Sequence, residues 1–124
     1  MTSAGRRRLP IYDATAAIVC TIGVDEVQDR IELFERMRER LVRIERTEHG
    51  VLLHFPARPD VEADLVGFAD VEKRCCSFWG FEIERDPDEL ALRWDAPPAA
   101  GDLVDRLITY FQGDEPLTAS SGLL

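Results

Sequence analysis

The sequence predicts an α+β domain with a mostly antiparallel β-sheet and helices on one face, in the order β-α-β-β-α-β-β-α. Pairs of segments with apolar residues at alternate positions, joined by short turns, are typical of β-hairpins. Segments with an apolar stripe at helical spacing separate these pairs. Of the 124 residues, 45% are hydrophobic, which is enough for one core. We therefore expect a single domain over residues 11–112, with flexible ends at 1–10 and 113–124.

The chain opens with a predicted strand and a predicted helix. Residues 16–22 form a β-prone run, which places Cys20 near the end of the first strand. Asp25 and Gln28 then have the spacing of a helix capping box. The apolar residues that follow repeat at helical intervals as far as Leu41, so we expect an amphipathic helix.

A hairpin and a second helix follow. Residues 42–46 and 51–55 alternate in polarity around a glycine-containing turn, which predicts two antiparallel strands. We expect Asp60 to cap the second helix. One face of this helix passes from apolar to reactive residues, in the order Val61, Leu65, Phe68, Glu72, Cys75 and Cys76.

The last elements are a second hairpin and a third helix. Residues 79–83 and 90–94 alternate, with Trp79 and Trp94 in phase with the apolar side chains, so both tryptophans are expected in the core. Asp102 is expected to cap the final helix. The acidic residues of the hairpin indicate a solvated face: Glu82, Glu84, Asp86, Asp88 and Glu89.

Composition excludes several classes of function. A formal net charge of -9 argues against a nucleic-acid partner, because phosphate contacts need clustered basic residues. No apolar stretch approaches the roughly 20 residues that a membrane-spanning helix needs, and the N-terminal residues lack the apolar run of a secretion signal. We therefore expect a cytoplasmic protein. In that reducing compartment its three cysteines should be thiols and not a disulfide framework.

The chemistry is concentrated around Glu72. Residues three and four apart on a helix are neighbours, so this carboxylate should lie beside the thiols of Cys75 and Cys76, on an otherwise apolar stripe. A buried carboxylate needs a partner, and Arg30 on the first helix and Arg74 are the two candidates. Partial burial would raise the pKa of Glu72 and let the protonated form act as a proton donor.

Three cysteines could form one metal site. Cys75 and Cys76 can share an ion if the helix ends there, and Cys20 is the natural third ligand if the first strand ends nearby. Three thiolates suit a soft metal or metalloid ion, such as Hg(II), As(III), Cd(II) or Cu(I), better than a closed zinc site. Zinc would need a fourth ligand from Glu72 or His54, and His54 should face away from its apolar neighbours on the strand. Cysteines that simply fill the core are the plain alternative.

The motif Glu72-Lys73-Arg74-Cys75-Cys76-Ser77-Phe78, together with Cys20-Thr21-Ile22 and Arg30, resembles a family of small, poorly characterised bacterial proteins. The resemblance covers most of residues 17–111. It implies an association with the response to heavy metals and metalloids. The commonest form of the motif has Pro at the position of Ser77 and Leu at the position of Ile22.

Three functions are weighed. The first is a soft-metal or metalloid binding protein that uses Cys20, Cys75 and Cys76, with Arg30 and Glu72 in support. The second is a thiol-dependent enzyme, either a redox protein or an organomercurial lyase in which Glu72 is the catalytic proton donor. The third is an interaction or regulatory module with structural cysteines. An apolar sheet face left uncovered would also allow a homodimer.

Overall fold

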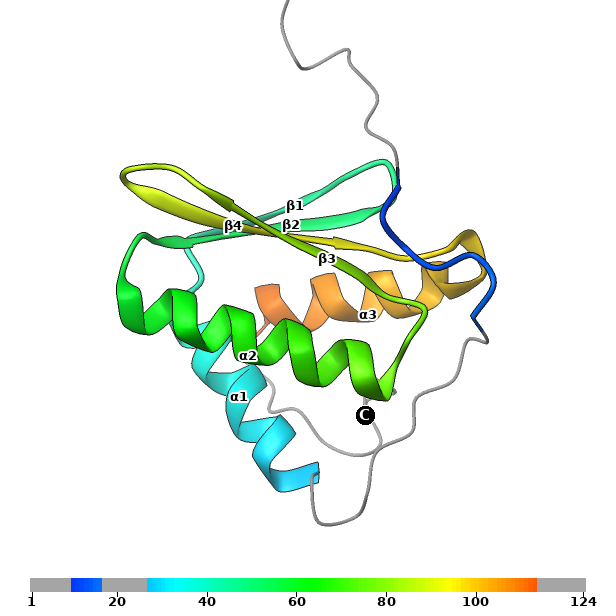
Figure 1. Ribbon diagram of the computed structural model, residues 1–124, viewed down its shortest axis with the longest axis horizontal. Coiled ribbons are helices and arrows are strands. Elements are labelled where there is room, and N and C mark those ends of the chain that lie inside the picture. Colours follow the sequence, from blue (N-terminus) through cyan, green and yellow to red (C-terminus); the bar gives the residue numbers. More distant parts are fainter. Residues whose placement is uncertain (1–9, 17–26, 114–124) are drawn as a thin grey trace, which may run out of the picture.

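Figure 1 shows the computed structural model, which describes residues 10–16 and 27–113, with the side chains of Val27 and Cys75 excepted. In this part of the chain three α-helices cover one face of a four-stranded antiparallel sheet of order β1-β2-β4-β3 (Figure 1). The predicted α+β class is confirmed. The predicted first strand falls almost entirely outside the described residues. The elements are α1 Val27–Arg40, β1 Arg43–Arg46, β2 Gly50–Pro56, α2 Pro59–Cys75, β3 Gly80–Arg85, β4 Glu89–Asp95 and α3 Gly101–Gln112.

The two central strands supply the inner face of the sheet. In the β2–β4 register, Leu53 lies opposite Leu92 and Phe55 opposite Leu90. These four side chains are buried, because alternate residues of a strand point to the same face and this face carries the helices.

Aromatic rings join the helices to the sheet. Phe34 on α1 meets Phe68 on α2 edge-to-face, with ring centroids 5.1 Å apart, and Phe68 meets Trp94 on β4 at 5.2 Å. Trp79, just before β3, contacts the same Trp94 ring at 5.1 Å. The prediction that both tryptophans lie in the core is confirmed, since both are buried. These contacts fix α1 and α2 side by side over the sheet.

Two helix starts differ from expectation. Arg58, and not Asp60, is the N-cap of α2, and it makes no side-chain capping hydrogen bond. The N-cap of α3 is Ala100, and not Asp102, again without a side-chain capping bond. Pro59 presets the backbone at the first position of α2, and a short 3-10 turn leads directly into α3. Both aspartates instead lie in the first helical turn, where a negative charge complements the helix dipole.

A segment before α1 is held against the start of β3. The amide of Ile11 donates to Asp95 Oδ2 at 3.2 Å, and the amide of Asp13 donates to the carbonyl of Phe78 at 3.1 Å. Gly80 allows this approach, because a Cβ at that position would lie 2.0 Å from the carbonyl oxygen of Ile11. The segment therefore packs against Phe78, the last residue of the cysteine motif, and against Gly80, the first residue of β3.

Candidate functional site

Glu72 lies on the buried stripe of α2. Val61, Leu65 and Phe68 precede it on the same face, and all three are buried. Glu72 continues the stripe with 1% of its surface exposed. The phase of the helix was thus correctly predicted from the sequence, and the stripe does carry a carboxylate into the interior.

Arg30 on α1 pairs with this carboxylate. Its Nε donates to Oε2 of Glu72 and its Nη2 donates to Oε1 at 2.6 Å, so the pair is bidentate. Arg30 is itself only 3% exposed, and its guanidinium lies 5.8 Å from the centre of the Phe34 ring. Arg74, the other predicted partner, is exposed and lies 3.9 Å from Asp70. The structure therefore brings Glu72 together with Arg30.

Opposing effects act on the Glu72 proton. Burial raises the pKa of Glu72 above its ordinary value, while the hydrogen bonds and the positive charge of Arg30 act in the lowering direction. An ionised Glu72 neutralises a guanidinium that cannot shed its own charge. With Glu72 ionised, the pair is therefore electrically neutral as a unit.

Cys76 lies directly after α2, whose last residue is Cys75. Its backbone leaves the helical conformation, with φ -132° and ψ 80°, while its amide still donates to the carbonyl of Glu72 at 2.7 Å. The helix thus ends within the cysteine pair, which is the condition under which the sequence analysis allowed both cysteines to share an ion. The Cys76 side chain is fully buried, and its sulfur lies 3.8 Å from Nη2 of Arg30.

The Cys76 sulfur is in a disulfide. The sequence had led us to expect free thiols, so this is a difference: a second sulfur lies within bonding distance of Cys76. That second sulfur lies outside the described side chains. Cys20 falls in residues 17–26, which the structure does not describe, and the side chain of Cys75 is not described either. The predicted site of three sulfurs stays a prediction.

One donor of Arg30 has no acceptor among the residues that the structure describes. Nη1 is buried, and within the described part of the chain no acceptor lies in hydrogen-bonding range. Sequence reasoning had placed Arg30 near Glu72 but missed this free N–H, because no pattern of residue types shows which of the nitrogens is used. A buried donor without an acceptor is destabilising. Among the described residues, the buried Nε1 atoms of Trp79 and Trp94 and Oδ1 of Asp95 also lack a partner.

His54 is not near the cysteine motif. It projects from β2 away from Leu53 and Phe55, as expected, with Nδ1 2.8 Å from Oε1 of Glu89 and Nε2 2.6 Å from Oε2 of Glu45. The carboxylates lie at the two ring nitrogens on opposite sides of the imidazole, so they do not converge on one ion. The hydrogen bond from His54 also lowers the pKa of Glu89, which sequence analysis had treated as a purely solvated residue.

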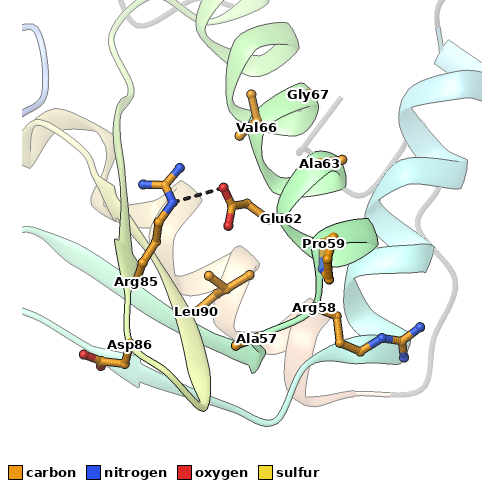
Figure 2. A pocket seen from close by; sticks show the side chains of 10 residues that line it. All are labelled: Ala57, Arg58, Pro59, Glu62, Ala63, Val66, Gly67, Arg85, Asp86 and Leu90. Atoms are coloured by element: carbon orange, nitrogen blue, oxygen red, sulfur yellow. Dashed lines mark hydrogen bonds and ion pairs between the residues drawn. The ribbon is translucent and has the colours of Figure 1, made fainter.

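A groove of about 680 Å³ lies between α2 and the β3–β4 hairpin (Figure 2). Its wall includes Val66 and Gly67 from the helix and Leu90 from β4. Glu62 and Arg85 point toward each other across it and form an ion pair, with Nε 3.0 Å from Oε2 (Figure 2). No cysteine or histidine lines this groove among the described residues, so we place the candidate chemistry at Cys76 instead.

Two other features are absent from the described residues. These residues contain no group of three or more His, Cys, Asp or Glu side chains arranged to hold a metal ion. None of the helices described here has the length and apolar character needed to cross a membrane. Comparison of the chain with protein-family models, with curated proteins and with solved structures finds no match.

Proposed function

We propose that this protein, once reduced, captures a soft metal ion or a trivalent metalloid through the thiolates of Cys20, Cys75 and Cys76. One observation carries the proposal: the buried sulfur of Cys76 lies against the Arg30–Glu72 pair and is bonded to a second sulfur. Thiolates bound to one zinc-sized ion lie within about 4.6 Å of each other, since each metal–sulfur bond is about 2.3 Å long. Sulfurs that form a disulfide therefore need little movement to share an ion.

The Arg30–Glu72 pair supports such a site electrostatically. A guanidinium 3.8 Å from the sulfur stabilises the thiolate form that binds metals. Glu72 balances the guanidinium charge, so the empty site does not bury a net positive charge. Binding a soft ion displaces thiol protons, and a buried carboxyl beside the site provides a nearby acceptor for them.

The ions that fit best are Hg(II), As(III), Cd(II) and Cu(I), because their affinity for sulfur exceeds their affinity for oxygen or nitrogen ligands. The site requires a reducing compartment such as the cytoplasm, where a small thiol would open the disulfide. The partner is thus an ion. A net charge of -9 disfavours a nucleic-acid partner, because the phosphate backbone is also negatively charged.

The test is a titration of the reduced, metal-free protein with each of these ions and with Zn(II), following thiol loss and proton release. We expect soft ions to consume thiols and release protons, and Cys76→Ser to weaken binding by at least about tenfold, which corresponds to about 1.4 kcal/mol. Ser77→Ala, at an exposed neighbouring position, is the control and should bind as the wild type does. Equal affinities for the wild type and Cys76→Ser would contradict the proposal.

A second function is favoured by the disulfide itself. In a thiol-dependent redox enzyme, two substrate thiols would reduce the Cys76 disulfide and leave as a new disulfide, with Glu72 relaying a proton. In an organomercurial lyase, thiolates would hold mercury while Glu72 protonated the leaving carbon. Turnover of a small disulfide, or of an aryl mercurial, that is lost in Cys76→Ser would support this function. Stoichiometric binding without turnover supports the first.

A further inference from the structure

β3 is an edge strand of the sheet, and one row of its backbone groups faces outward. Among the described strands it pairs with β4 alone. At the hairpin turn the amide of Asp86 donates to the carbonyl of Glu89, and hydrogen-bonded pairs alternate along an antiparallel ladder. The even-numbered residues of β3 therefore bond to β4. The N–H and C=O groups of Phe81, Ile83 and Arg85 point to the open side of the strand.

Two described features adjoin this row of groups, and neither pairs with it along its length. Nη1 of the exposed Arg85 side chain lies 3.4 Å from the carbonyl oxygen of Ile83. The segment of residues 10–16 contacts Phe78 and Gly80, at the start of the strand. An open row of backbone donors and acceptors is a template on which another strand can pair.

An apolar channel runs beside this edge. The groove between α2 and the β3–β4 hairpin (Figure 2) is continued by a second hollow of about 590 Å³, and Val66 and Gly67 line both. Val66 is 49% exposed, which is unusual for a large apolar side chain in this protein. Phe81 and Ile83 line the second hollow from β3 and are half-buried. A strand laid along β3 would therefore place alternate side chains in this channel.

The opposite face of β3 is acidic. Glu82 and Glu84 alternate with the apolar residues and so project from the sheet face away from the helices. Glu82 is 53% exposed, although its carboxylate lies 3.6 Å from Nη1 of Arg93. Residues directly opposite each other on neighbouring strands share a face, and opposite charges there are stabilising. The strand that fits this edge carries basic side chains opposite the glutamates and apolar side chains over the groove.

The same row of glutamates disfavours a second copy of this chain as the occupant. Two-fold symmetry would pair β3 with β3 in antiparallel fashion. In the three central registers Ile83 lies opposite Phe81, Ile83 or Arg85 of the copy, and each of them places a glutamate opposite a glutamate. Like charges directly opposite each other are destabilising.

We propose that the β3 edge and the groove beside it form a docking site for an extended segment of a partner protein, in which basic and apolar residues alternate. The segment adds to the sheet as a further antiparallel strand. Its apolar side chains enter the groove over Val66, and its basic side chains lie opposite Glu82 and Glu84. Backbone hydrogen bonds to the edge supply affinity, and the alternating side chains supply specificity. The docking site is independent of the function proposed at Cys76.

The test uses the full chain and a peptide of six residues, the length of β3, in which lysine and valine alternate and both ends are blocked. In antiparallel pairing the valines share the face of Phe81 and Ile83, and their own N–H and C=O groups bond to β3. Magnetic resonance of isotope-labelled protein follows each backbone amide. We expect the amides of Phe81, Ile83 and Arg85 to shift, and to exchange with solvent about fivefold more slowly or less when peptide is saturating.

Altered peptides separate the backbone contribution from the charge contribution. N-methylation of the valines removes the donors that face β3, whereas N-methylation of the lysines removes donors that face away. We expect the first peptide not to bind and the second to bind as the parent does. Replacing the lysines by glutamates should weaken binding by about tenfold or more. Equal binding of the two methylated peptides would overturn strand addition, and undiminished binding of the glutamate peptide would overturn the basic partner.

Two variants of the protein test the groove and the acidic row. A Cβ at Gly67 meets nothing within 4 Å, so Gly67→Leu keeps α2 intact and fills the groove. Gly101→Leu is its control, at another helical glycine with open space around it. Glu82→Lys is compared with Glu39→Lys, which changes the net charge equally at an exposed position on α1. We expect Gly67→Leu and Glu82→Lys to weaken peptide binding by about threefold or more, and the controls to match the wild type.

The remaining outcomes concern the occupant. We expect the free protein to sediment as a monomer, with exchange rates at Phe81 and Ile83 that do not depend on its concentration. Protection of these amides that increases with protein concentration would show a second copy on this edge and would overturn the proposed partner. Losses in Gly67→Leu and Glu82→Lys no larger than in their controls would overturn the groove and the acidic row. Unchanged β3 amides at about 1 mM peptide would overturn the docking site itself.

Discussion

Arg30 and Glu72, 42 positions apart in the sequence, form a buried bidentate ion pair that joins α1 to α2 beneath the sulfur of Cys76. The pair is both a packing element and a chemical one. It replaces apolar contacts on the inner face of α2 and sets the electrostatic surroundings of the cysteine. Its contribution to stability and its contribution to the proposed binding of an ion can be measured separately.

Breaking the pair from one side should be costly. Arg30→Met leaves Glu72 buried without its partner, and Glu72→Met leaves an arginine charge buried, so each change should lower the free energy of unfolding by about 3–5 kcal/mol. The double variant places two apolar side chains in contact and should be less destabilised than the sum of the single variants. Urea denaturation followed by circular dichroism measures all four proteins. Single variants within about 1 kcal/mol of the wild type would show that the pair is not buried as described.

Tyr110 should make the fold sensitive to alkali. Burial raises the pKa of Tyr110, and its hydrogen bond to Glu35 adds to the rise. Above about pH 10 the unfolded chain loses this proton and the folded protein keeps it, so stability falls as pH increases beyond that point. Tyr110→Phe has no phenol proton at this position, so its free energy of unfolding should not fall with pH for this reason. Free energies of unfolding measured between about pH 8 and pH 11 should converge for the two proteins, and parallel curves would contradict the assignment.

Gly80 and Gly67 should respond oppositely to alanine. At Gly80 a Cβ would collide with the Ile11 carbonyl, so Gly80→Ala should displace the segment of residues 10–16 and destabilise the protein. At Gly67, inside α2, a Cβ meets nothing within 4 Å, so Gly67→Ala should raise stability by about 0.5–1 kcal/mol. Thermal unfolding gives the sign of each effect. Equal shifts for both variants would argue against the contact between Ile11 and Gly80.

Periodicity accounts for what could be predicted from the sequence. Helical spacing placed Glu72 on the buried face of α2, and strand alternation placed His54 on the opposite face of the sheet from Leu53. Both follow from local backbone geometry and need no knowledge of distant contacts. The sequence also left only two candidate partners for the Glu72 carboxylate, Arg30 and Arg74.

The remaining features depend on three-dimensional contacts. The caps expected at Asp60 and Asp102 were wrong because neighbouring backbone, a proline in one case and a 3-10 turn in the other, starts each helix earlier. The disulfide at Cys76 and the free Nη1 of Arg30 depend on distances of a few ångströms between elements. Residue types and spacing alone do not determine such distances.

The most direct test of the central claim is X-ray absorption spectroscopy of the reduced protein loaded with one equivalent of Hg(II), and separately of arsenous acid. The spectrum identifies the atoms bound to the ion without any assumption about the fold. We predict sulfur bound to the ion in the wild type, and one sulfur fewer in Cys76→Ser. Only oxygen or nitrogen bound to the ion in the wild type, or an unchanged number of sulfurs in Cys76→Ser, would contradict a thiolate site at Cys76.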